Sequence, residues 1–368
     1  MTGQAGTLAA RPAGGRRCVA PASRGPYRRR PRRLGSGASA GGPAPGRPML
    51  AAQATFPSCC PPMRTRLLVG IFVAWMLGLR VEAADRFSVA TYNVENYLDA
   101  PVPGRTTKPP EAKARVCDTL LALRADVVAL QEMGGTNALL QLRSALAAGG
   151  LNYPHWEHVR GHDTNIHVAL LSRFPITARR PHTEDSFLLQ GRRFSVSRGF
   201  LEVDLQVAPG FQLTLLAAHL KSKRPVPGAD QAELREQEAR LLREKIDARL
   251  KASPAAPLLV LGDFNDTRDA KPIRTLIGRG RSALVDLRPE EALRPAPDTP
   301  LQRPAPNVTW TYFYAREDSY ARFDYMLANR ALADRLVPAE TCVLALPWWR
   351  EASDHRPVLA TFRLPGRE

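Results

Sequence analysis

Side chains that could bind a metal ion or a phosphate follow the apolar segment 258–261. This segment is typical of a short buried strand, Gly262 ends it, and Asp263, Asn265 and Asp266 follow. With a strand's period of two, Asp263 and Asn265 face the same side. Leaving a buried polar group unsatisfied costs about 1–3 kcal/mol. The pattern therefore indicates a site that holds a hard cation, a phosphate oxygen or an attacking water, and the alternative is a polar turn that merely closes the strand.

Other expected strands end in polar groups of the same kind. These groups are Asn93 with Glu95, Gln131 with Glu132, His219, Asp324, and Asp354 with His355. Carboxylate oxygens suit Mg²⁺, and an imidazole beside a phosphate can donate a hydrogen bond to it. Each group alone has an ordinary explanation as a surface ion pair or a strand-end polar residue. Together they favour a metal-assisted site.

A histidine that acts as a base or holds a phosphate needs a carboxylate to fix its tautomer and raise its basicity. Asp354 precedes His355 directly, so on an extended backbone its side chain points the other way. We therefore predict that Asp324 orients His355 and that Asp354 is a metal ligand or positions a water. The alternative for Asp324 is a strand-end ion pair with Arg322.

Two further groups are candidates for substrate binding. The basic loop at 221–228 carries Lys221, Lys223 and Arg224, which would steer an anionic substrate or lie on a solvated loop. Trp348 and Trp349 come shortly before Asp354. They would contact a membrane interface, stack on bases or pack on the core.

Alternating strand and helix patterns must position these groups. Helices are expected at 111–124, 136–148 with Thr136 as the cap, 230–251 with Asp230 as the cap, and 272–277. Strands are expected at 87–94, 126–131, 153–159, 166–172, 193–207, 211–219, 258–261, 308–314, 322–327, 342–346 and 356–362, with proline-rich loops at 101–110 and 288–306. With no interior linker, residues 85–368 form one α/β domain of two packed sheets with helices outside.

The first 84 residues differ in composition from the rest. Residues 1–62 are rich in Arg, Pro, Gly and Ala and contain no Asp or Glu, which indicates a disordered leader or a mis-assigned start before Met63. Residues 63–84 have a basic flank, an apolar run at 67–79 and small residues at the exit, which predicts a signal peptide. The run is shorter than the roughly 20 residues of a membrane span. We therefore expect an exported protein, and an uncleaved signal anchor is the alternative.

This segment also carries most of the chain's basic excess. The net charge is +17, but residues 1–83 hold 13 of the 52 Lys and Arg and one of the 35 acidic residues, so the remainder has a net charge of +5. That charge only mildly favours an anionic partner. Cys117 and Cys342 lie in the remainder, where they could pair in an exported protein or remain thiols.

The ordered set of motifs resembles that of the endonuclease/exonuclease/phosphatase superfamily. The motifs are Asn93-x-Glu95, Gln131-Glu132, His219-Leu220, Gly262-Asp263-Phe264-Asn265, Arg322-Phe323-Asp324-Tyr325 and Ser353-Asp354-His355. The resemblance implies a four-layer αββα sandwich and Mg²⁺- or Mn²⁺-dependent hydrolysis of a phosphoester. His167 departs from it, because many relatives have Gly at this place before the strand.

The resemblance also implies a role for each residue. Glu132 is the principal metal ligand, Asn93 and Glu95 lie beside it, and Asp354 lies near the metal. Asp263 and Asn265 position the nucleophile and the phosphate, and His219 contacts the scissile phosphate. His355, paired with Asp324, acts as a base or stabilises the phosphate.

The substrate is less well defined by the sequence. We expect an exported nuclease-like phosphodiesterase acting on nucleic acid, with no obligate protein partner. The alternatives are a sphingomyelinase-like phospholipid phosphodiesterase, which would use Trp348 and Trp349 at a membrane, and a sugar or inositol phosphatase. A non-enzymatic binding module is disfavoured because Glu132, Asp263 and His355 are all present.

Overall fold

The structure is a computed structural model that describes residues 85–293, 299–303 and 309–366. The expected leader and signal peptide lie outside these residues, so both remain predictions. Within the described part of the chain, no helix is long and apolar enough to cross a membrane.

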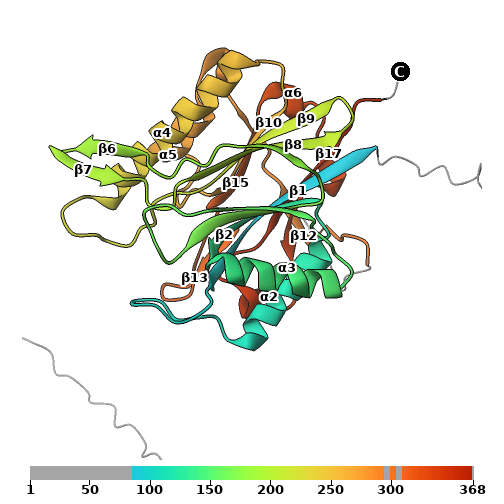
Figure 1. Cartoon of the computed structure of the whole chain (residues 1–368), viewed down its shortest axis with the longest axis horizontal. Coiled ribbons are helices and arrows are strands. Elements are labelled where there is room, and N and C mark those ends of the chain that lie inside the picture. Colours follow the sequence, from blue (N-terminus) through green and yellow to red (C-terminus); the bar gives the residue numbers. More distant parts are fainter. Residues whose placement is uncertain (1–84, 294–298, 304–308, 367–368) are drawn as a thin grey trace, which may run out of the picture. The chain divides into compact units, whose positions relative to one another are not determined.

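Two mixed sheets form the centre of the domain (Figure 1). The strands of the seven-stranded sheet are, in spatial order, β12 (Glu290–Leu293), β16 (Cys342–Ala345), β17 (Val358–Arg363), β1 (Arg86–Tyr97), β2 (Val127–Met133), β4 (His167–Ser172) and β3 (His155–Val159). Those of the six-stranded sheet are β11 (Val285–Asp286), β15 (Asp324–Ala328), β10 (Leu258–Asp263), β9 (Phe211–His219), β8 (Phe200–Ala208) and β5 (Ile176–Arg179). The β1–β2, β12–β16 and β10–β9 pairs are parallel, and the other strand pairs of the two sheets are antiparallel.

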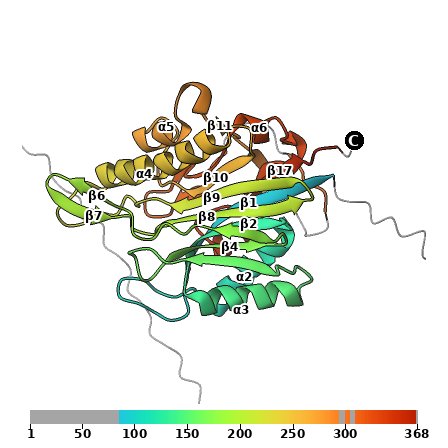
Figure 2. The same cartoon turned by 45° about the horizontal axis from the view of Figure 1, so that its top comes forward.

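Helices cover the outer face of each sheet, which Figure 2 shows from a second direction. α2 (Pro110–Leu123), α3 (Thr136–Ala148) and the short α7 (Trp349–Ala352) lie against the seven-stranded sheet, and α4 (Gln231–Ala252) and α5 (Lys271–Ile277) against the other. The remaining elements are α6 (Arg330–Ala333) and the hairpins β6 (Ser186–Leu189) with β7 (Arg192–Ser195) and β13 (Tyr312–Tyr314) with β14 (Ser319–Ala321).

Strand alternation produces three apolar layers. In β2, Val127 and Ala129 pack between the two sheets, whereas Val128 and Leu130 pack beneath α2 and α3. A third cluster fills the space between the six-stranded sheet and the α4–α5 pair. This confirms the expected four-layer αββα sandwich.

Several local expectations are corrected. Thr136 is not the cap of α3: Gly135 holds that position, and no side chain caps this end. The single strand expected at 193–207 is two strands, β7 and β8, separated by a turn in which Gly199 has a φ of +68°. The loop expected at 288–306 contains β12, which pairs with β16. Its sequence, Glu-Glu-Ala-Leu, gives little local strand signal, so the pairing depends on the open edge of β16.

Other expectations are confirmed. Asp230 caps α4, because its side chain accepts hydrogen bonds from the backbone N–H groups of Ala232 and Glu233. Of the two alternatives left open for Cys117 and Cys342, the structure shows thiols that are not joined by a disulfide.

Candidate active site

The register of the strands brings the predicted residues together. On β10, Asp263 lies opposite His219 of β9 and Asp324 of β15. In the facing sheet, Asn93 of β1 lies opposite Gln131 of β2. The polar ends of strands from both sheets therefore meet at one edge of the sandwich.

Gly262 allows Asp263 to reach this edge. Its φ is +138°, and an added Cβ would lie 1.9 Å from the carbonyl oxygen of Ala218 on β9. Only glycine fits such a close approach between the two strands. The glycine that ends the apolar segment is thus required by the backbone.

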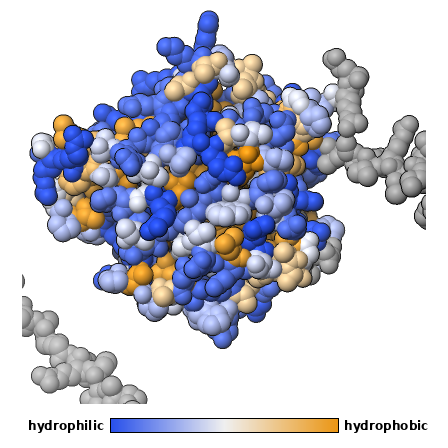
Figure 3. Space-filling view, viewed as in Figure 1, coloured by the Kyte–Doolittle hydropathy of each residue, from blue (hydrophilic) through white to orange (hydrophobic). Residues whose placement is uncertain are grey.

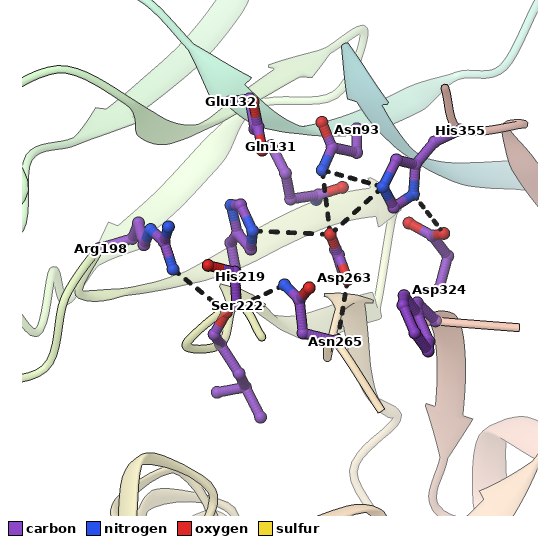
Figure 4. Close-up of polar contacts among 12 residues, drawn as sticks. Asn93, Gln131, Glu132, Arg198, His219, Ser222, Asp263, Asn265, Asp324 and His355 are labelled. Atoms are coloured by element: carbon purple, nitrogen blue, oxygen red, sulfur yellow. Dashed lines mark hydrogen bonds and ion pairs between the residues drawn. The ribbon is translucent and has the colours of Figure 1, made fainter. Parts of the chain in front are cut away.

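Asp263 is the centre of the polar contacts (Figure 4). Its Oδ2 accepts a hydrogen bond from Nδ2 of Asn93 at 2.9 Å and lies 3.5 Å from Nε2 of His219 and 3.6 Å from Nε2 of His355. Its Oδ1 accepts the backbone N–H of Asn265 at 2.9 Å. Burial, reinforced by the nearby Asp324, raises the pKa of Asp263 above its ordinary value despite the opposing effect of His355.

His355 lies between two carboxylates. Its Nδ1 is 2.8 Å from Oδ2 of Asp324, so the predicted pairing is confirmed, and its Nε2 faces Asp263. Burial alone would lower the pKa of His355, but Asp324 and Asp263 outweigh it and raise the pKa well above 6.5. The ring is therefore an imidazolium near neutral pH.

His219 has the opposite electrostatic environment. Burial, together with the positive charges of Arg198, His355 and Arg105, lowers its pKa well below 6.5. The ring is neutral near pH 7, and its Nδ1 has no hydrogen-bond partner among the described residues. The site thus holds one neutral and one charged imidazole on opposite sides of Asp263.

Three carboxylates lie beside this network and have the chemistry of a hard-cation site. Burial and the negative charges of Glu95 and Glu132 raise the pKa of Asp354 to about 7, against the effect of His355. A divalent cation would relieve this mutual repulsion, and oxygen donors suit Mg²⁺ or Mn²⁺. The donor set therefore fits the metal that was predicted.

A second arrangement of possible ligands is more compact. Among the described residues, Asp263, Asp324 and His355 offer ligand atoms within 4.8 Å of one another. The 2.8 Å contact between Asp324 and His355 already uses Nδ1 of the ring. We therefore interpret this trio as a hydrogen-bonded group, and the role of Glu95, Glu132 and Asp354 as metal ligands stays a prediction.

Backbone strain is concentrated at the site. Glu95, Asn96, Glu132 and Asn265 have φ values of 44°, 50°, 59° and 54°. Residues other than glycine rarely adopt this left-handed region, at a cost of about 1–3 kcal/mol each. The strain directs these side chains away from the regular strand alternation at the sheet edge.

Three cations at the site were missed by the sequence reasoning. Nη1 of Arg105 lies 3.6 Å from Oε2 of Glu132, and Nζ of Lys108 lies 3.2 Å from Oε2 of Glu95. Arg198 donates to the carbonyl of Leu220 at 3.2 Å. Arg105 and Lys108 belong to the loop at 101–110, whose only local signal was its Pro and Gly content.

Hydrogen bonds hold the first residue of the basic loop that follows β9. Nζ of Lys221 donates to the carbonyls of Ser222 and Arg224 at 3.1 and 3.0 Å. Burial lowers the pKa of Lys221 to about 8, and Arg198 adds to the effect. Lys223 is exposed, lies 3.6 Å from Asp266 and is placed over the ring of Phe323. Of the three basic residues, only Lys223 and Arg224 are exposed to solvent.

The two tryptophans pack against the protein. Trp348 contacts the core beneath α2, and its Nε1 donates to Oγ1 of Thr119 at 3.3 Å. Trp349 makes edge contacts with Trp310 and Phe313 at centroid distances of 4.8 and 5.8 Å. Both are partly buried, which favours the packing interpretation.

His167 is 2 % exposed, on β4. Its ring lies 4.9 Å from that of His158, and burial lowers its pKa to about 4. It therefore remains neutral and lies outside the contacts around Asp263.

Comparisons with known proteins agree with this architecture. The fold is similar to the endonuclease/exonuclease/phosphatase from Beutenbergia cavernae, with 21% identity and a TM-score of 0.52 over 77% of this chain and 72% of that one. It is also similar to the one from Bacteroides vulgatus, with 16% identity and a TM-score of 0.52 over 77% of this chain and 100% of that one. Sphingomyelinase C from Streptomyces griseocarneus has 18% identity and a TM-score of 0.50 over 76% and 100%.

At these identities the likeness shows the fold alone, and no curated protein matches the sequence. The sequence model of one family does match, over residues 90–355, and this span runs from β1 to His355 and includes each of the six motifs. On this evidence, the chain belongs to the endonuclease/exonuclease/phosphatase family.

Proposed function

We propose that this protein hydrolyses phosphodiesters with the help of Mg²⁺ or Mn²⁺ and that its substrate is a nucleic acid. Members of the family are generally hydrolases. The observation that carries the proposal is the position of Asp263, whose Oδ2 lies between the neutral His219 and the charged His355.

This arrangement suits attack by water on a phosphate. The raised pKa of Asp263 brings its carboxylate towards the range in which a general base works best near neutral pH. Asp263 accepts the proton of the attacking water, and the amide of Asn93 keeps Oδ2 directed into the site. Asn265 has its amide nitrogen fixed on the carbonyl of Leu220 at 3.1 Å, which leaves its side-chain oxygen available to orient that water.

The two histidines stabilise the phosphate. The His355 imidazolium, held by Asp324, donates a hydrogen bond to a non-bridging oxygen as negative charge develops. His219 donates a further hydrogen bond as a neutral imidazole. When bound by Glu95, Glu132 and Asp354, with Asn93 beside them, the metal ion supplies charge neutralisation at the phosphoryl oxygens.

Nucleic acid is favoured over lipid by the surface near the site. Lys223 and Arg224 are exposed there, and Arg105 and Arg198 add charge beside Glu132 and His219. On the face drawn in Figure 3, hydrophobic residues are scattered among hydrophilic ones. Together with the packing of Trp348 and Trp349, this does not favour a membrane-docking surface.

We further propose that the protein is exported, as the basic flank, apolar run and small residues at 63–84 indicate. Cell fractionation tests this, together with sequencing of the mature N-terminus. Recovery of the intact chain in the cytoplasm alone would exclude export.

The catalytic proposal is tested by assaying plasmid DNA, RNA, bis(p-nitrophenyl) phosphate, sphingomyelin vesicles and an inositol polyphosphate with Mg²⁺ or Mn²⁺. We expect chelator-sensitive hydrolysis of the diester and the nucleic acids. Asp263→Asn should lower kcat by about 10²–10⁴-fold, whereas His155→Gln on β3 should have no effect. Activity confined to the vesicles or to the inositol polyphosphate would show that the substrate is a phospholipid or an inositol phosphate and not a nucleic acid. Wild-type activity in Asp263→Asn would refute the assigned site.

A further inference from the structure

A basic groove lies between α4 and α5 and was not part of the predicted site. It has a volume of about 880 Å³, and its lining includes five cationic residues and two acidic ones. The cations are Arg240, Arg268, Lys271, Arg274 and Arg279, and all five are exposed.

Three of the five cations are paired with carboxylates, and two are not. Glu236 is shared by Arg240 at 3.2 Å and Lys271 at 3.4 Å, and Arg268 lies 3.7 Å from Asp286. In the part of the chain that the structure describes, neither Arg274 nor Arg279 has a carboxylate oxygen within 4.0 Å. Surface cations so arranged attract a polyanion and release its counterions when it binds.

The groove lies close in sequence to residues at the active-site edge. Asp266 follows Asn265, and its Oδ2 accepts a hydrogen bond from Nε of Arg235 on α4 at 2.9 Å. The first groove residue of α4, Glu236, comes directly after Arg235, and Arg268 follows Asp266 by two residues. Through Arg235 and Asp266, one end of α4 is therefore held near the phosphate site.

The lining also indicates how a ligand is held. The groove contains no aromatic residue, so it offers no platform on which bases could stack. Guanidinium groups instead match the phosphate oxygens of a backbone, which gives affinity without sequence preference. A concave channel fits a linear chain better than it fits a flat bilayer.

We propose that this groove binds the phosphate backbone of a polynucleotide strand that extends from the active site. The assignment rests on the proposed function, because it names how the same substrate is held beyond the cleaved bond. It predicts that affinity rises with strand length until the groove is filled.

Binding is tested without hydrolysis, in the full chain carrying Asp263→Asn. Fluorescence anisotropy with labelled oligothymidylates of 4 and 20 nucleotides, in chelator, measures Kd over a range of salt concentrations. The double variant Arg274→Gln/Arg279→Gln removes two charges on the groove. A control for loss of surface charge is Arg330→Gln, which removes one charge at an exposed position on α6, outside the groove lining.

Removal of the two groove charges should weaken binding of the 20-mer by about tenfold at low salt. It should also reduce the slope of log K against log salt by about 1.4, since each single-strand phosphate contact contributes about 0.7. The control should match the parent protein, and the 4-mer should be little affected. An unchanged affinity and slope for the 20-mer would overturn the groove assignment.

A separate assay distinguishes this failure from that of the proposed function. Hydrolysis of bis(p-nitrophenyl) phosphate does not need the groove, so the double variant in the otherwise wild-type chain should retain full activity on it. If the wild-type chain does not hydrolyse this diester, the proposed function is refuted. The anisotropy measurements then decide independently whether the groove binds a polynucleotide strand.

Discussion

Oδ2 of Asp324 lies 2.8 Å from Nδ1 of His355, and both side chains are almost fully buried. Asp324 begins β15 of the six-stranded sheet, and His355 precedes β17 of the seven-stranded sheet. This contact joins the two sheets at the candidate site, as does the hydrogen bond from Asn93 to Asp263, and it raises the pKa of the imidazole. The position of His355 is coupled to the packing of the sheets.

Asp324→Asn should lower the pKa of His355 towards 6.5, because it removes the larger of the two negative influences on the ring. Catalysis should fall by about 10²–10⁴-fold near neutral pH. The raised pKa stabilises the folded state fully below the unfolded value of about 6.5, and this stabilisation is lost as pH rises through the folded pKa. The variant should thus lose most stability below pH 6.5.

Titration of the imidazole by NMR measures this pKa directly, and urea unfolding at pH 5.5 and 8.5 measures the stability. Asp334→Asn, at an exposed position after α6, is the control and should change neither. A His355 ring that titrates at the same pH in Asp324→Asn would show that Asp324 does not set its charge.

The local sequence was sufficient to predict this pair and much of the site. Neighbouring residues on an extended backbone point in opposite directions, so Asp324 rather than Asp354 was predicted as the partner of His355. The strand that ends in Asp263 was predicted because its apolar run is typical of a strand buried on two faces.

Contacts that depend on loops could not be predicted in this way. Arg105 and Lys108 reach Glu132 and Glu95 only because the 101–110 loop folds back over the sheet edge. Nothing in its composition encodes that path. Likewise β12 forms because β16 offers an edge, and Trp348 is partly buried because α2 packs beside it.

Arg105→Gln should increase the affinity of the site for a divalent cation. Its guanidinium neutralises Glu132 at 3.6 Å and would repel a cation bound there. Because a partly exposed ion pair contributes up to about 1 kcal/mol, we expect Kd for Mg²⁺ or Mn²⁺ to fall by about three- to fivefold. Isothermal titration calorimetry measures it, with Arg330→Gln as a control of equal charge. Weaker metal binding in Arg105→Gln would contradict this interpretation of the ion pair.

Glu202 on β8 should contribute to the loss of fold stability as the pH falls into the acid range. Its carboxylate contacts Arg180, Arg249 and His182 at 2.5, 2.5 and 2.7 Å. Burial opposes its ionisation, but these hydrogen bonds and charges lower its pKa to about 2. Since the folded pKa lies below the unfolded value, the stabilisation is present above about pH 4.5 and is lost as pH falls towards 2.

Glu202→Gln should therefore lower the free energy of unfolding by about 3 kcal/mol at pH 7, because it leaves three cationic or polar groups without their carboxylate. Urea unfolding at pH 7 and pH 3 should show the difference from the wild type shrinking in acid. Glu290→Gln, at an exposed pair on β12, should cost little at either pH. If the difference in unfolding free energy between wild type and variant instead grew in acid, ionised Glu202 would not be the source of the stabilisation.

Arg124 at the end of α2 provides a test of strain outside the site. It has φ 52° and ψ 31°, the left-handed conformation in which glycine is favoured at a helix C-terminus, and its backbone N–H donates to the carbonyl of Leu120. Arg124→Gly should raise the free energy of unfolding by about 0.5–1 kcal/mol.

Arg124→Ala removes the same side chain but keeps the Cβ, so it isolates the backbone effect and should not stabilise the fold. Thermal unfolding of both variants gives the comparison, and equal melting temperatures would exclude strain at this cap. Glu132 has a similar φ of 59°, but there the strained backbone carries a proposed metal ligand. Glu132→Gly should relieve the same strain and still abolish metal binding, because glycine lacks the carboxylate that is proposed to bind the metal.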